Sequence, residues 1–317
     1  MRGYRAACRR PYTDRMMSRR WPPFVVGMAI AVTMPLLAAC DSGGTGDGGS
    51  VSDPSSGSSG PIAVEVNQSR DQYGKQAILL QLTNTTDAPL TVTAARLRST
   101  LFADDISWEP SEGGLELPPR QPKSLPAILP AAACETSGDA SPELNARITY
   151  AAPGKEPAEG ITDASDPFDV LTRNAGELCL ATEVAAVAAI VLDPALEVAA
   201  DGRTAVVRLV ITPATPGGSA NTLTIESIDG TTLLAEAPSD PWPRNVTIAP
   251  GDSIRDLALR IRPARCDPHA VAEDKVGTLL PLRITVGERQ GSVKIAASNE
   301  LRGRIYDFVT AACATAG

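Results

Sequence analysis

Apolar and polar residues alternate along much of the chain beyond residue 60. Ile62–Val66 reads Ile-Ala-Val-Glu-Val, and further apolar runs rich in β-branched residues are bounded by Gly and Pro. A period of two residues is typical of a strand that buries one face. The pattern predicts strands at Ile62–Val66, Ala77–Leu82, Leu90–Leu97, Ala205–Thr212, Leu223–Ile228, Ser253–Ile261, Thr278–Val286 and Gly291–Ala296.

Helical signals beyond residue 60 are weak, since no long stretch has an apolar stripe of helical period. Glu183–Ala189 is rich in alanine but short, and we expect it to run between domains. Short strands separated by Gly and Pro favour antiparallel sandwiches. We therefore predict an all-β protein made of antiparallel β-sandwich domains with immunoglobulin-like architecture.

The chain carries an internal duplication. Leu90-Thr-Val-Thr matches Leu223-Thr-Ile-Glu, and Arg147-Ile-Thr-Tyr matches Arg283-Ile-Thr-Val. Rare residues recur at offsets of 134, 132 and 134 in the pairs Trp108 and Trp242, Cys134 and Cys266, and Cys179 and Cys313. These matches predict two tandem domains, at residues 61–183 and 184–317. We expect each tryptophan to fill its own core or cap a sheet edge, the alternative being to stack on a ligand.

The duplication also selects a cysteine pairing. Of the three pairings open to four cysteines, the one that preserves the repeat joins Cys134 to Cys179 and Cys266 to Cys313. Each bridge would close a loop of about 46 residues, for which the chain-entropy model gives on the order of 4 kcal/mol. Both cysteines lie late in each repeat, so we expect each bridge to join a late loop to the final strand. Free or metal-bound thiols are the alternative.

The N-terminal segment has the features of an export signal. Seven arginines and one acid precede sixteen uncharged residues at Phe24–Ala39, which is shorter than the roughly 20 residues of a membrane-spanning helix. Translation could begin at Met1, Met16 or Met17.

The uncharged run ends in Leu37-Ala38-Ala39-Cys40, which resembles the lipobox of bacterial lipoproteins. The resemblance implies removal of residues 1–39, a diacylglyceryl thioether on Cys40 and an extracytoplasmic protein anchored in the cell membrane. The alternative is a plain signal peptide or a short membrane anchor.

Composition bears on the segment after Cys40 and on whether the protein binds nucleic acid. Residues 40–60 are mostly Gly, Ser, Asp and Thr, which predicts a flexible tether. Removal of residues 1–39 leaves 22 basic and 36 acidic residues, so the net charge becomes 22 − 36 = −14. Since this surface repels phosphate backbones and no basic patch with aromatic residues is present, we expect no binding to nucleic acid.

The most distinctive motif lies in the second repeat, where four residues are inserted relative to the first. It contains Asp267, His269, Glu273 and Asp274, which could be ligands for a small molecule or metal, or an acid–base group. The alternative is that Asp267 caps a short helix and Pro268 lies in its first turn. One histidine makes a weak transition-metal site, so we name no metal and no cofactor.

Three aspartates, Asp163, Asp166 and Asp169, could offer oxygen ligands to calcium, but they match no calcium loop and a solvated turn is favoured. No Gly-x-Ser-x-Gly motif and no phosphate-binding Gly-rich loop between a strand and a helix are present.

We expect a non-enzymatic binding or interaction module whose partner is an envelope protein or glycan. The runner-up is an accessory subunit that binds a small ligand or metal through the His269 insertion. A weaker alternative is a glycan hydrolase that uses acidic residues alone.

Overall fold

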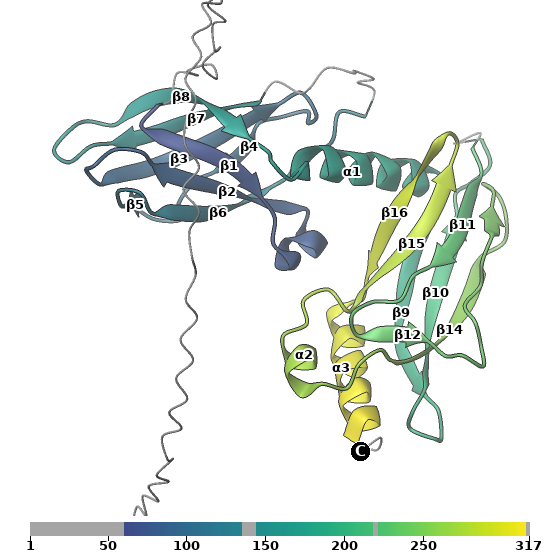
Figure 1. Cartoon of the computed structure of the whole chain (residues 1–317). Coiled ribbons are helices and arrows are strands. Elements are labelled where there is room, and N and C mark those ends of the chain that lie inside the picture. Colours follow the sequence, from purple (N-terminus) through teal and green to yellow (C-terminus); the bar gives the residue numbers. More distant parts are fainter. Residues whose placement is uncertain (1–59, 135–143, 218–220, 315–317) are drawn as a thin grey trace, which may run out of the picture. The chain divides into compact units, whose positions relative to one another are not determined.

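The computed structural model describes residues 60–134, 144–217 and 221–314 (Figure 1). The predicted signal segment, Cys40 and nearly all of the tether lie outside these ranges. The first repeat contains β1 (Ile62–Asn67), η1 (Arg70–Lys75), β2 (Ala77–Asn84), β3 (Leu90–Ser99), β4 (Ile106–Trp108), β5 (Leu115–Leu117), β6 (Pro122–Ile128), β7 (Leu144–Ala151), β8 (Ala158–Ser165) and α1 (Val170–Val187).

The second repeat has the same order of strands and ends in a helix as well. It contains β9 (Ala188–Val198), β10 (Ala205–Pro213), β11 (Leu223–Ile228), β12 (Leu234–Glu236), β13 (Val246–Ile248), β14 (Arg255–Pro263), α2 (Pro268–Ala272), β15 (Leu279–Val286), β16 (Arg289–Ala296) and α3 (Asn299–Ala314). The eight predicted strands are all present, with ends within a few residues of the predicted ones, so the all-β prediction is confirmed.

Strand pairing makes each repeat a β-sandwich. In the second repeat, one four-stranded sheet has the order β12-β14-β10-β9 and the other has the order β13-β11-β15-β16. In the first repeat, β1, β2 and β6 form one layer, and β3, β4, β5, β7 and β8 form the other. A short parallel pair, in which Val64 lies opposite Ala164, joins β1 to β8 and links the two layers into one eight-stranded sheet.

The pairings support the predicted duplication. Five antiparallel pairs recur: β1–β2 with β9–β10, β2–β6 with β10–β14, β3–β5 with β11–β13, β3–β7 with β11–β15, and β7–β8 with β15–β16. A register shift also recurs, between Val92 and Ala94 in β3 and between Ile225 and Ser227 in β11. The repeats differ in one edge strand, because β4 pairs with β3 whereas β12 pairs with β14.

One detail of the predicted alignment is wrong. Thr91 pairs with Ala151, and the equivalent Thr224 pairs with Thr285, so β7 and β15 align at an offset of 134 residues. The match of the two Arg-Ile-Thr motifs implies an offset of 136. Because side chains alternate between the two faces of a strand, an error of two residues leaves every side chain on the correct face.

The alternating pattern of the strands creates the two hydrophobic cores. In β2, every second residue from Ile78 is buried, and in β10 the buried residues are Ala205, Val207, Leu209 and Ile211. The first core includes Leu82, Leu97 and Ile106, all fully buried. The second includes Leu209, Ile225 and Ile284. Residues that face the core thus come from both sheets of each sandwich, as in sandwiches generally.

The expectation that long helices are lacking is wrong for both repeats. Helix α1 has 18 residues and α3 has 16. Among the described residues, neither these nor any other helix is long and apolar enough to cross a membrane. Glu183–Ala189 is the last turn of α1 and the first residues of β9, and not a separate connection.

Helix α1 contributes to both hydrophobic cores. Leu171 and Ala175 belong to the first core, whereas Leu180, Val184 and Val187 belong to the second. The predicted boundary between residues 183 and 184 falls inside this helix. Because no residues separate the first repeat's last helix from β9, the two sandwiches share this element and have no flexible linker between them.

The N-terminus of α1 is capped by Asp166. Its Oδ1 accepts a hydrogen bond from the backbone N–H of Val170, and its Oδ2 accepts one from Leu171, both at 2.8 Å. Asp169, the residue directly before the helix, has a φ of 49° and makes no side-chain cap. Asp166 therefore satisfies two of the four N–H groups that a helix start leaves without partners.

Replacement of Asp166 by alanine should lower the free energy of unfolding by about 0.5–2 kcal/mol, the usual effect of losing a helix cap. Asp163→Ala is the matched control, because Asp163 is an exposed carboxylate on β8; its effect should stay within about 0.5 kcal/mol. Urea unfolding followed by circular dichroism measures both. Equal effects of the two substitutions would contradict the capping role.

Candidate binding groove

One disulfide lies in each repeat, with the predicted pairing. Cys134 is bonded to Cys179 and Cys266 to Cys313, with Cα atoms 5.4 Å and 5.3 Å apart. The expectation that each bridge ends on the final strand is wrong. Cys179 lies on α1 and Cys313 on α3, so each bridge joins the loop after the sixth strand of its repeat to the helix that ends the repeat.

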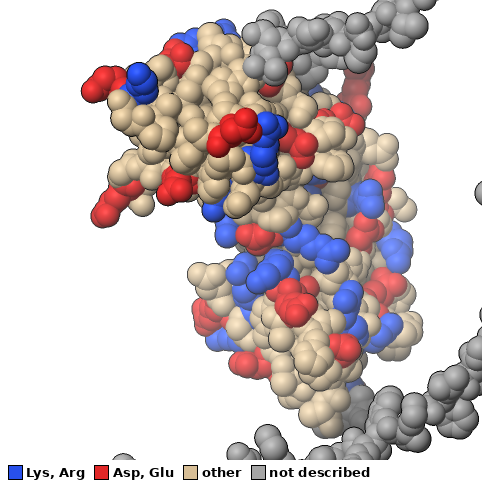
Figure 2. Space-filling view, turned by 60° about the vertical axis from the view of Figure 1, so that its left-hand side comes forward, with Lys and Arg blue, Asp and Glu red and all other residues tan. Residues whose placement is uncertain are grey.

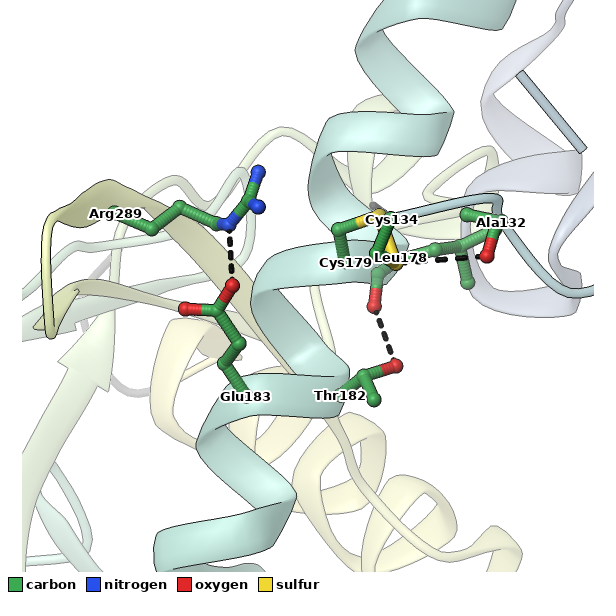
Figure 3. The surroundings of a disulfide bond; sticks show 7 residues. All are labelled: Ala132, Cys134, Leu178, Cys179, Thr182, Glu183 and Arg289. Atoms are coloured by element: carbon green, nitrogen blue, oxygen red, sulfur yellow. Dashed lines mark hydrogen bonds and ion pairs between the residues drawn. A yellow bond between two sulfur atoms is a disulfide. The ribbon is translucent and has the colours of Figure 1, made fainter. Parts of the chain in front are cut away.

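A disulfide and two ion pairs fix the position of α1 near the first bridge. Figure 3 shows Cys134 bonded to Cys179 and, further along the helix, the carboxylate of Glu183 directed at Arg289 of β16. This ion pair has an N–O distance of 2.7 Å, and Lys294 of β16 lies 2.6 Å from Glu177. All four charged side chains are partly exposed, so each pair contributes modestly and mainly fixes the position of the helix.

The two bridges differ in their exposure to solvent. Cys179 is buried, at 6% exposure, and Cys134 is half-buried. In the second bridge, Cys266 is exposed and Cys313 is half-buried. Since thiol–disulfide exchange requires a thiolate to reach a sulfur atom, the second bridge is the more accessible to a reductant.

The insertion of the second repeat forms α2, which lies beside α3 (Figure 1). Asp267 Oδ1 accepts a hydrogen bond from the backbone N–H of Ala270 at 2.9 Å, and Pro268 lies in the first turn. The helix-capping interpretation of this motif is therefore correct.

The four candidate ligands of this motif do not meet at one point. Asp267 is engaged as the cap of α2, and His269 and Glu273 are exposed. Asp274 accepts hydrogen bonds elsewhere, as described below. Within the ranges that the structure describes, no three His, Cys, Asp or Glu side chains gather closely enough to hold a metal ion.

Asp274 organises the turn that precedes β15. Its carboxylate accepts hydrogen bonds from the Thr232 hydroxyl, from the backbone N–H of Gly277 at 2.7 Å, and from the Tyr306 hydroxyl at 3.0 Å. A Cβ atom at Gly277 would lie 2.3 Å from Leu233 Cβ and 2.5 Å from Asp274 Oδ2, so this approach requires glycine. Asp274 thus joins the loop after β11, the insertion and α3.

Tyr306 lies between this cluster and the second bridge. Burial, together with the hydrogen bond to Asp274 and the negative charge of that carboxylate, raises the pKa of Tyr306 to about 12. The phenol is therefore neutral at physiological pH, and its hydroxyl is occupied by Asp274, with the backbone oxygen of Asp274 a further 3.1 Å contact.

A groove of about 570 Å³ lies between α2 and α3, next to the Cys266–Cys313 bridge. Helix α2 lines it with Pro268, Val271 and Ala272. The facing lining comes from α3 and the bridge: Tyr306, Val309, Thr310, Cys313, Ala314 and Cys266. The candidate ligands Asp267, His269, Glu273 and Asp274 do not line the groove, whereas the predicted disulfide and Pro268 do.

The remaining candidate residues have structural roles. Trp242 is buried and donates from Nε1 to the backbone oxygen of Arg260 at 2.8 Å, and Trp108 is half-buried against the first core. Both tryptophans therefore pack into their own domains. Of the three aspartates weighed as calcium ligands, Asp166 caps α1, Asp169 precedes that helix, and Asp163 lies exposed on β8.

Charges of both signs are interspersed on the visible face of the molecule (Figure 2). Exposed charges form ion pairs across neighbouring strands, as Arg208 of β10 does with Glu197 of β9 and with Asp256 of β14. Arg147 and Glu159 make a similar pair between β7 and β8. Because these side chains are exposed, the pairs add little to stability.

Comparisons with known proteins give only distant likenesses. No family model and no curated protein matches the chain. The YadV chaperone structure is 15% identical, with 74% of this chain and 100% of that chain covered and a TM-score of 0.20. The exo-chitosanase CsxA of Amycolatopsis orientalis is also 15% identical, covering 74% of this chain and 26% of that chain, at a TM-score of 0.20. Red sea bream transglutaminase is 8% identical, covering 76% and 32%, at 0.22. Likenesses at these TM-scores carry no argument about activity.

The difference in exposure predicts an order of reduction. With increasing dithiothreitol, Cys266 and Cys313 should become alkylated by iodoacetamide before Cys134 and Cys179, as read by mass spectrometry of the peptides. In the control variant Cys266→Ala/Cys313→Ala, the early labelling should vanish and the late labelling remain. Earlier labelling of Cys134 and Cys179 in the native protein would show that burial of Cys179 does not protect its bridge.

Proposed function

We propose that the protein is exported, lipidated at Cys40 and held outside the cytoplasm on the cell membrane, where it acts as a non-enzymatic binding module for an envelope protein or glycan. The observation that supports export most strongly is the disulfide in each repeat, since such bonds persist in oxidising compartments and are rare in the cytosol. It agrees with the lipobox-like Leu37-Ala38-Ala39-Cys40, which precedes the tether and the two sandwiches.

The arrangement of the two sandwiches suits a binding role. Helix α1 packs into both cores, and each terminal helix is covalently tied to its own repeat. Domains whose terminal helices are tied down in this way should lose little conformational freedom of their own on binding a partner, which favours affinity. Two acyl chains are sufficient to hold such a protein stably at a bilayer, whereas one chain holds it only marginally.

A second candidate function is an accessory subunit that binds a small ligand through the insertion of the second repeat. The groove between α2 and α3 favours this candidate. The ligand would contact the apolar face of the insertion, since His269 and Glu273 are exposed and do not line the groove.

The anchor is tested by replacing Cys40 with alanine in the full chain. The native protein should be found in the membrane fraction at mature size, whereas Cys40→Ala should be released or should keep its N-terminal segment. Cys8→Ala is the matched control, because it removes a cysteine from the same segment and should leave anchoring unchanged. If Cys40→Ala stays in the membrane fraction at mature size, the proposed lipid anchor is wrong.

A further inference from the structure

We propose that the groove between α2 and α3 is a binding site for an uncharged, mainly apolar small molecule that carries an alkyl chain or ring. This inference names the ligand class of the second candidate function and rests on the protein having a binding role.

The lining is mainly apolar. Val271 and the Cys266–Cys313 bridge provide aliphatic and sulfur surface, and Thr310 and Tyr306 carry the only side-chain hydroxyls among the lining residues. The volume of about 570 Å³ is within the range of small-molecule sites, which combine apolar walls with few polar groups. A ligand here would gain most of its affinity from burying apolar surface.

The partly buried polar cluster next to the groove is already paired. The Tyr306 hydroxyl bonds to Asp274, and the Asp274 carboxylate also accepts from Thr232 and Gly277. No lining residue carries a charge. A charged group placed in the groove would lose its hydration without gaining a partner, which is costly. The lining therefore selects a neutral ligand.

The insertion makes the groove but adds little to the core. None of the residues of α2 is buried, and Pro268 and Ala272 are exposed. Only Val271 packs against the second core, and does so partly buried. Residues 135–143, which correspond to this segment in the first repeat, read Glu-Thr-Ser-Gly-Asp-Ala-Ser-Pro-Glu and offer no valine or other large apolar side chain. In the second repeat, the apolar side chains of Pro268, Val271 and Ala272 on α2 line the groove opposite α3.

The test uses the full chain in both the membrane and the soluble fraction of lysed cells, and a neutral probe, a long-chain alcohol bearing a diazirine and an alkyne tag. After irradiation, mass spectrometry should find the probe on peptides that contain residues 266–272 or 306–314. Thr310→Arg places a long charged side chain at the groove and should reduce this labelling about tenfold or more. Thr310 is exposed, so the variant should fold, which intact disulfides on non-reducing peptide analysis would verify.

His269→Ala is the matched control, because His269 lies on α2 but outside the lining, and labelling should be unchanged. Excess decanol should suppress the labelling, and decanoate at neutral pH should not. The inference would be overturned if Thr310→Arg left the labelling intact or if decanoate suppressed the labelling as strongly as decanol. Loss of labelling in His269→Ala would overturn it as well. So would cross-linking of the groove to a second copy or to another protein in place of the probe. The labelling is read on the protein in any fraction, so failure of the Cys40 anchor is a separate result.

Discussion

Each repeat is closed by one covalent bond between the loop after its sixth strand and its terminal helix. The hydrophobic cores contain few aromatic residues, since Phe, Trp and Tyr make up 4% of the chain. The disulfide fixes the last helix of each repeat to the loop after the sixth strand. By closing a loop of about 46 residues, it stabilises the fold on the order of 4 kcal/mol in the chain-entropy model.

The same helix has taken different roles in the two repeats. When the helices are aligned on Cys179 and Cys313, the buried Phe308 of α3 corresponds to Asn174 of α1. Asn174 is buried too, but it exchanges hydrogen bonds with Gln68 at 3.1 Å and 3.2 Å. Helix α1 is therefore fastened to its own repeat by a polar contact, while its second half packs into the core of the next repeat. A terminal helix has become a shared element.

The strands and the disulfide pairing could be predicted from the sequence because their signals are local or repeated. The alternation of apolar and polar residues predicted β1 and β10. The nearly constant sequence spacing between the two repeats selected the cysteine pairing. Both helices were missed for different reasons. In α3, Leu301, Ile305, Phe308, Val309 and Ala312 follow a helical spacing that was available and overlooked. In α1, the alanine-rich sequence packs against two cores on different sides, so its apolar residues follow no single stripe.

The candidate site could be predicted only in part. The sequence located the insertion and the cap that Asp267 provides, because a cap is a local interaction. The groove depends on how α2 and α3 face each other and on the Asp274 contacts to Thr232 and Tyr306, which join residues far apart in the chain. The polar residues of the motif pointed to a site at His269, whereas the groove is lined by Val271.

Peptide mapping of the unreduced, protease-digested protein would reveal whether each repeat of the duplicated sandwich is closed by its own bridge. We expect two cross-linked peptide pairs, one joining Cys134 to Cys179 and one joining Cys266 to Cys313. A bond between the repeats, or four cysteines alkylated without reductant, would rule out this arrangement.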